Sequence, residues 1–310
     1  MDEWTTNQFG SYGQYTPVFA ALGTNSIPFV LRRLSRDDSF LKNSYREVYP
    51  KLPGFIKKYL PARNPRSGER FFQASMAAAA LQACGSNAVP VLIPKLKDGN
   101  PAVREACFSS VSGLAHSSMS TRETISTFLP CLDDSEPMVR VNAALFYGRL
   151  GPAASNAIPA LIRNLRSNET GRHHYASERV YVRAISAMAL GQIGPPAVSA
   201  VPALTNLMAS TNSYARASAA CAVWQITSNA SLSLPVLIGA FPTYDRDAKW
   251  QLIQTFAEMG PLAKSALPLL TNELKNADRR TWEMLTNALK RIDSEAAEKA
   301  GVTSEPKEMR

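Results

Sequence analysis

The chain has 310 residues, of which 45% are hydrophobic and 19% charged, and its formal net charge is +9. This composition is that of a folded protein with apolar material for one or two domains, and it excludes a disordered chain. No apolar run approaches the ~18 residues of a membrane span, and the acidic start MDEWTTNQFG is unlike a secretory signal. We therefore expect a cytoplasmic protein without a membrane span.

Residues 1–75 hold an incomplete repeat followed by a basic and aromatic segment. Eleven Lys and Arg stand against four Asp and Glu between residues 30 and 75, and four prolines interrupt the stretch 39–72. We favour a cap over the open apolar face of the first repeat. A nucleic-acid platform and a short amphipathic contact with a membrane or partner are the alternatives. The candidate binding cations of this segment are Lys51, Lys57, Lys58 and Arg63.

The rest of the chain repeats one pattern. An anchor residue within IPALI-like stretches recurs at Pro28, Pro90, Ser126, Pro159, Pro202, Pro235 and Pro268, and three of the intervals are 33 residues. A basic residue follows fourteen positions later, once ten extra residues after Pro159 are allowed for; this basic column is Arg104, Arg140, Arg183, Arg216 and Lys249. Two columns with the same period indicate a stacked array of structural repeats.

Each repeat predicts two helices. An Ala-rich apolar stripe at helical spacing, as in VRVNAALFYGRLG (139–151), predicts a first helix that ends at a glycine. The anchor proline then opens a second helix at its first turn, where its missing N–H is no loss. The second helix carries an apolar face such as Leu161, Ile162 and Leu165. A single unit cannot bury both of its apolar sides, so the units must stack.

The pattern VRxxAAxALGxIGPxAxxAxPALIxxL resembles HEAT repeats, most closely the HEAT-like repeats of phycobilisome lyases, and the opening copy is similar to bacterial HEAT-repeat proteins. The resemblance covers about 76–292 and implies an all-α, right-handed α-solenoid of about seven stacked hairpins. We therefore expect an N-terminal capping region at 1–75, the solenoid at 76–292 and a polar tail at 293–310. HEAT-like arrays include scaffolds, adaptors, bilin lyases, an iron-dependent hydroxylase and DNA glycosylases, so the resemblance leaves function open.

Residues for catalysis or metal binding are sparse. None of the three histidines is followed by Glu, which argues against the iron site of the hydroxylase family, and no P-loop, GxGxxG, GxSxG or HExxH motif occurs. His173 and His174 lie in an extra loop. We interpret this loop as a solvated rim and contact site rather than as a metal site. The four cysteines lack metal-binding spacing and are expected in the core. We therefore expect that the chain binds no cofactor and is not an enzyme.

The second helices are expected to line a concave, partner-binding face. Positions four and five after each anchor should point outward, and they are more basic toward the N-terminus. The candidate partner-binding residues are Arg32, Arg33, Lys95, Arg163, Asn164, Asn206 and Asn272. We assign the basic column a structural role, in which its members bond acidic residues in the loops of neighbouring repeats.

Two functions remain open at this point. We favour a non-enzymatic scaffold or adaptor, a monomer that binds a protein or peptide partner, including an acidic one. The alternative is a nucleic-acid-binding protein like the HEAT-like DNA glycosylases, which uses the basic N-terminal half. That alternative needs a groove aspartate flanked by aromatic residues, and Asp133, Asp134 and Trp224 are the nearest candidates. Nothing beyond the shared repeat supports a bilin lyase.

Overall fold

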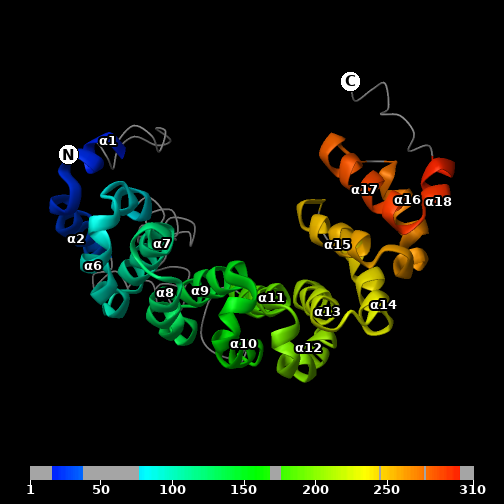
Figure 1. Ribbon diagram of the computed structural model, residues 1–310, viewed down its shortest axis with the longest axis horizontal. Coiled ribbons are helices and arrows are strands. Elements are labelled where there is room, and N and C mark those ends of the chain that lie inside the picture. The colour runs from blue at the N-terminus through cyan, green and yellow to red at the C-terminus, as the bar shows by residue number, and fades with distance from the viewer. Residues whose placement is uncertain (1–15, 38–76, 168–175, 244–245, 276, 301–310) are drawn as a thin grey trace, which may run out of the picture. The chain divides into compact units, whose positions relative to one another are not determined.

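The computed structural model describes residues 16–37, 77–167, 176–243, 246–275 and 277–300, and every regular element in these ranges is a helix (Figure 1). The predicted all-α array of stacked helical hairpins is confirmed. Contacts divide the chain into two compact units, Met1–Ala143 and Ala144–Arg310, each of which is treated by itself. Several predicted positions lie outside the described residues: Lys51, Lys57, Lys58, Arg63, His173 and His174.

The first unit begins with α1 (Thr16–Leu22), the 3-10 turn η2 (Gly23–Ser26) and α2 (Ile27–Asp37), and resumes with a helix over residues 77–83. There follow η4 (Ser86–Ala88), α6 (Val89–Leu92), η5 (Ile93–Lys97), α7 (Pro101–Ser118), α8 (Thr121–Phe128), η6 (Leu129–Asp133) and the start of α9 (Pro137–Leu150). The rings of Phe108 and Phe128, both fully buried, lie 4.8 Å apart between centroids and join α7 to α8.

The second unit contains four first helices and four second helices within its described residues. The first helices are α11 (Ala176–Ile193), α13 (Ser213–Thr227), α15 (Arg246–Met259) and α17 (Arg279–Ile292). The second helices are α10 (Ile158–Leu165), α12 (Val201–Met208), α14 (Ala230–Ala240) and α16 (Leu267–Leu274), and the short α18 (Ser294–Lys299) follows α17. The connecting 3-10 turns are η7 (Gly151–Ala157), η8 (Pro195–Ala200), η9 (Phe241–Thr243) and η10 (Gly260–Ala266). Helix α11 packs on α13, and α15 packs on α17.

The turn from first to second helix follows the predicted chemistry in three copies of this unit. Gly151, Gly194 and Gly260 have φ values of 58°, 78° and 56°, a backbone conformation that glycine adopts at least cost. A 3-10 turn follows each glycine, and the anchor proline lies in the first turn of α10, α12 or α16. The sequence therefore predicted correctly the glycine at which the first helix ends and the proline at which the second helix begins.

Two copies begin their second helix earlier than predicted. Pro235 lies inside α14, which begins at Ala230 because the Asn229 side chain accepts a hydrogen bond from the backbone N–H of Leu232. In the copy with Ser126 as its anchor, α8 begins at Thr121. Ser120 and Glu123 form a capping box there, with each side chain bonded to the other's backbone N–H. A capping side chain thus starts the helix where the Gly-Pro turn is missing.

Small residues let the first helices approach closely. A Cβ placed on Gly191 of α11 would lie 2.9 Å from the Cα of Ala222 in α13. Ala219, Ala220 and Ala222 are all fully buried in α13. The Ala-rich stripe of the sequence is therefore the contact surface between neighbouring repeats.

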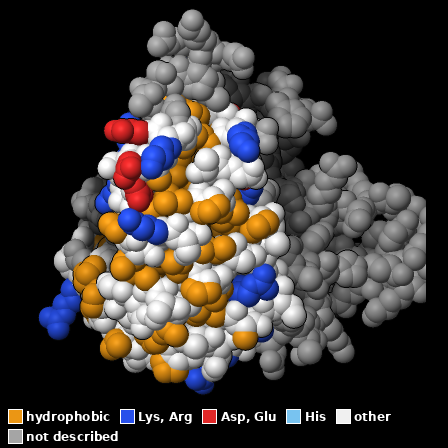
Figure 2. All heavy atoms as spheres, turned by 90° about the vertical axis from the view of Figure 1, so that its right-hand side faces the viewer, with side chains coloured by type: hydrophobic (Ala, Val, Ile, Leu, Met, Phe, Trp, Pro, Cys, Tyr) orange, Lys and Arg blue, Asp and Glu red, His pale blue; other side chains and the backbone are white. Residues whose placement is uncertain are grey.

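The segment predicted as a polar tail, residues 293–310, begins with a short helix. Residues 294–299 form α18, which is capped by the Asp293 side chain, and Ala297 is the buried residue of this helix. Helix α17 buries Leu285, Ala288, Leu289 and Ile292, whereas its opposite side is charged. Figure 2 views the side of the molecule on which α16 and α18 lie in Figure 1, and it shows hydrophobic side chains interspersed with backbone and other side chains, with Lys and Arg around them. This pattern fits a terminal repeat that faces solvent.

Within the described part of the chain, no single helix is long and apolar enough to cross a membrane. One bent pair, residues 77–83 and 86–97 at 111° to each other, reaches that length and composition only when both helices are taken together.

Candidate functional site

The position four residues after each anchor lies on the surface in every copy. Arg32, Arg163, Asn206 and Asn272 are exposed on α2, α10, α12 and α16, and Pro94, Pro130 and Gly239 are exposed at the same position in the other copies. We call these seven residues the exposed column. Lys95, one residue further along η5, is also exposed and pairs with Asp98 at 3.4 Å. The side chain of Arg33 lies outside the described part of the structure.

Asn164 is not a surface residue, which corrects the prediction. Its exposed fraction is only 5%, and it lies beside the buried Leu161 and Leu165 on the inner face of α10. A helix turns by about 100° per residue, so positions three and four apart share a face, and in α10 the fifth position after the anchor turns inward with Leu161 and Leu165. Leu207 and Ala240, at the same position of α12 and α14, are buried as well.

The basic column bonds mainly to backbone carbonyls of the loop before its own helix. Arg140 Nη1 donates to the carbonyl oxygens of Asp134 and Ser135. Arg216 Nη1 donates to those of Ser210 and Thr211. Acidic side chains are described partners of Arg104 and Lys249: Arg104 binds Asp134 in the loop after η6, and Lys249 binds Glu273 of α16, the second helix of its own repeat, at 2.8 Å. Most of the column therefore fixes its own loop at the start of the first helix.

Arg104 and Asp134 form a bidentate, nearly buried ion pair. Arg104 Nε and Nη2 donate to the two carboxylate oxygens of Asp134 at 2.8 and 2.7 Å, while Nη1 donates to the carbonyl of Asp98 at 2.8 Å. The two side chains are only 10% and 9% exposed. The bond to Asp134 is the largest cause of the raised pKa of Arg104. Because both oxygens of Asp134 are engaged, this residue is a poor candidate for a catalytic groove aspartate.

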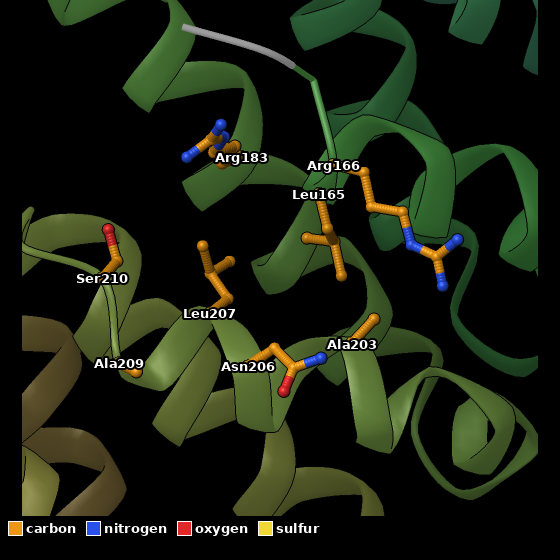
Figure 3. Close-up of a pocket in the computed structure, with 8 residues that line it drawn as sticks. All are labelled: Leu165, Arg166, Arg183, Ala203, Asn206, Leu207, Ala209 and Ser210. Atoms are coloured by element: carbon orange, nitrogen blue, oxygen red, sulfur yellow. The ribbon is translucent and has the colours of Figure 1, made fainter.

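A hollow of about 270 Å³ opens between α10, α11 and α12 (Figure 3). We call it the Arg183 hollow. Leu165, Leu207, Ala203 and Ala209 form its apolar lining, and Arg166, Arg183, Asn206 and Ser210 form its polar lining. In Figure 3, Arg183 and Ser210 lie on one side of Leu207, and the Arg166 side chain extends away on the other. Sequence reasoning singled out Arg183 and Asn206 but did not bring them together, since they belong to different columns.

The cysteines are buried, as expected, and their chemistry is that of core residues. Burial raises the pKa of the Cys107, Cys131 and Cys221 thiols to about 12. A thiol with such a pKa supplies almost no thiolate near neutral pH, which a nucleophile or metal ligand needs. In the described ranges, no three His, Cys, Asp or Glu side chains gather in a group that could hold a metal ion.

Comparisons with known proteins found one family model and one solved structure. A family model described as Cnd1, non-SMC mitotic condensation complex subunit 1, matches residues 74–189. A solved structure, the complex of CpcE and CpcF of phycocyanin lyase from Nostoc sp. PCC7120, is similar with a TM-score of 0.46 and 21% identity, over 77% of this chain and 89% of that chain. No curated protein matches. The chain is a HEAT-repeat protein in its fold, as its sequence pattern implies.

The second of these comparisons corrects one expectation. We expected the chain not to be an enzyme, because its sequence lacks catalytic motifs, but the similar structure belongs to a lyase complex. The absence of catalytic motifs does not distinguish a scaffold from an array that forms part of a lyase. The expectation that the chain is not an enzyme is therefore contradicted.

Proposed function

We propose that this chain is a scaffold or adaptor that binds a protein partner along the outward surface of its second helices. The observation that carries the proposal is the exposed column, which reaches the surface in each of its seven copies. Its side chains are cationic at Arg32 and Arg163 and are amides at Asn206 and Asn272. Within each unit, stacked helical repeats present such recurrent positions as an extended binding surface.

The distribution of charge favours a protein over a nucleic acid. Residues 30–75 carry a net charge of +7 out of the total of +9, whereas residues 77–143 have five Lys and Arg against six Asp and Glu. Phosphate contacts supply most non-specific nucleic-acid affinity and need a run of cations. Residues 77–143 do not offer such a run, and a mixed surface with amides and apolar positions suits a protein segment that carries some acidic residues.

The test is affinity capture from native lysate, with and without nuclease, followed by mass spectrometry. We expect the capture of a defined protein partner. This capture should persist after nuclease treatment and be lost with the Arg163→Glu variant. The matched control is Arg279→Glu, which makes the same charge reversal at an exposed residue of α17, away from the exposed column. Circular dichroism would check that both variants are folded.

Two results would count against the proposal. Capture that disappears with nuclease would support nucleic-acid binding, with the basic segment as the site. Capture that is equal for Arg163→Glu and the unaltered protein would remove the second-helix surface as the binding face.

A further inference from the structure

One edge of the second unit carries a large exposed hydrophobic side chain in three consecutive repeats. Val198 of η8, Leu232 of α14 and Leu262 of η10 are 62%, 46% and 58% exposed, and each lies three to six residues before the anchor proline of its repeat. Among the described residues, no large hydrophobic side chain is more exposed than Val198 and Leu262. Single exposed side chains of this kind are ordinary, but their recurrence at one place in the repeat indicates a contact surface.

The segments that carry these side chains are neighbours and are built rigidly. We call them the apolar edge; they are residues 194–200, 228–234 and 260–266. Helix η8 packs against α13, which leads directly into the segment of Leu232, and α14 packs against η10. Pro195, Pro196 and Pro261 are exposed on the same edge. Proline-containing turns lose little conformational freedom on binding, so apolar area on them contributes more fully to association.

The apolar edge is nearly free of charge in a chain whose net charge is +9. Its three segments contain one charged residue, Lys264, which pairs with Asp293 at 3.1 Å. Between Arg183 and Asp245 the sequence has a single charged residue, Arg216, which bonds to the loop at the start of α13, about 18 Å along that helix from the edge. A charged segment placed on this edge would lose hydration without gaining a counter-charge. The edge therefore suits an uncharged, apolar surface.

The spacing along the edge fits a second copy of the same chain. Leu232 lies one repeat away from Val198 on one side and from Leu262 on the other. A two-fold axis at Leu232 would bring this residue against its own counterpart and set Val198 of each copy against Leu262 of the other. Closed dimers use such isologous contacts, in which residue i meets j and j meets i. The same axis sets Lys264 against the uncharged η8 of the other copy, so that no like charges of the edge meet.

We propose that two copies of this chain associate along the apolar edge, with Leu232 at a two-fold axis and Val198 opposite Leu262. The dimer replaces the monomer that was expected from the sequence pattern. The exposed column takes no part in this contact, so the inference goes beyond the proposed partner-binding surface.

The first experiment measures the mass of the full chain by sedimentation equilibrium over a concentration series. We expect the mass to rise toward twice the 33.8 kDa of one chain, and Leu232→Asp to return it to one chain. This variant should fold, because an acidic residue is favourable in the first turn of α14. The matched control is Val91→Asp in the first unit, where the side chain is also 46% exposed, and it should leave the dimer intact. A single-chain mass at every concentration, or a dimer that persists in Leu232→Asp, would overturn the inference.

The second experiment tests the two-fold arrangement by disulfide formation under copper–phenanthroline. A disulfide needs Cα atoms within about 7 Å, so Leu232→Cys should cross-link to itself across the axis. Val198→Cys and Leu262→Cys should each stay uncross-linked alone and form a heterodimer when mixed. All four native cysteines are buried, so the unaltered chain supplies the background.

The pattern of cross-links decides between an ordered dimer and chance collision. Cross-linking of Leu232→Cys no faster than that of Val91→Cys would overturn the inference. So would Val198→Cys and Leu262→Cys that cross-link as readily with themselves as with each other.

Discussion

The bidentate Arg104–Asp134 pair joins the first turn of α7 to the loop that follows η6. Its charges are nearly removed from water, so each depends on the other for compensation. We predict that Asp134→Ala lowers the free energy of unfolding by about 3 kcal/mol, because it leaves the Arg104 guanidinium without its carboxylate. Urea denaturation measures the effect. The control is Glu283→Ala, which breaks an exposed pair with Arg279 and should cost less than about 0.5 kcal/mol.

Ser228 stands where other repeats have glycine. Its φ of 53° is a left-handed conformation that disfavours a side chain. We predict that Ser228→Gly raises the free energy of unfolding by about 0.5–1 kcal/mol, whereas Gly194→Ala, at φ 78°, lowers it by about 1 kcal/mol. Thermal unfolding of the two variants checks both signs. A destabilised Ser228→Gly would mean that the serine side chain does more than occupy the turn.

The buried thiols lead to a prediction about labelling. With pKa values of about 12, Cys107, Cys131 and Cys221 are protonated at pH 8 and shielded from reagents. We expect iodoacetamide to leave these three residues unmodified in the native protein and to modify them in urea, as peptide mass spectrometry would show. Rapid native labelling of Cys221, which is only 1% exposed, would mean that α13 opens locally.

At the scale of helices, the spacing between repeats depends on the absence of a single Cβ. We predict that Gly191→Ala lowers the free energy of unfolding by about 1–3 kcal/mol, because its methyl group would press on the backbone of Ala222. Gly239→Ala is the matched control: apart from its chain neighbours and the backbone of its own helix, no atom of the described residues lies within 4 Å of the methyl group that it would add. It should be neutral or stabilising by up to about 1 kcal/mol, since alanine favours helix more than glycine. Chemical denaturation of both variants compares the two effects.

The sequence was most informative about elements with a repeated pattern. The period, the Gly-Pro turns and the buried stripe could all be read from it, because each copy needs the same residue types to stack. It was less informative where a copy departs from the pattern, as at Pro235, whose helix is started five residues earlier by the cap at Asn229. The Arg183 hollow could not be predicted, because its lining comes from α10, α11, α12 and the loops after α10 and α12, whose residues belong to different columns of the repeat.

At the scale of the molecule, stability is distributed along the array. Phe256 is fully buried, its ring lies 6.1 Å from that of Phe241, and it belongs to the core formed by residues of α13–α18. We predict that Phe256→Ala costs about 3–5 kcal/mol. Hydrogen exchange should accelerate in α13–α17 and remain unchanged in α7, because repeats contact mainly their neighbours. Equal acceleration in α7 would indicate a single cooperative unit.

The regular spacing has a consequence for changes in chain length. Pro202, Pro235 and Pro268 are separated by 33 residues each, and the helices that follow them present matching surfaces to the repeats on either side. Removing one residue from α13 rotates every later side chain of that helix by about 100° and turns its buried alanines toward solvent. Removing a whole period restores the original phase and brings two compatible surfaces together. The array is therefore easier to shorten by thirty-three residues than by one.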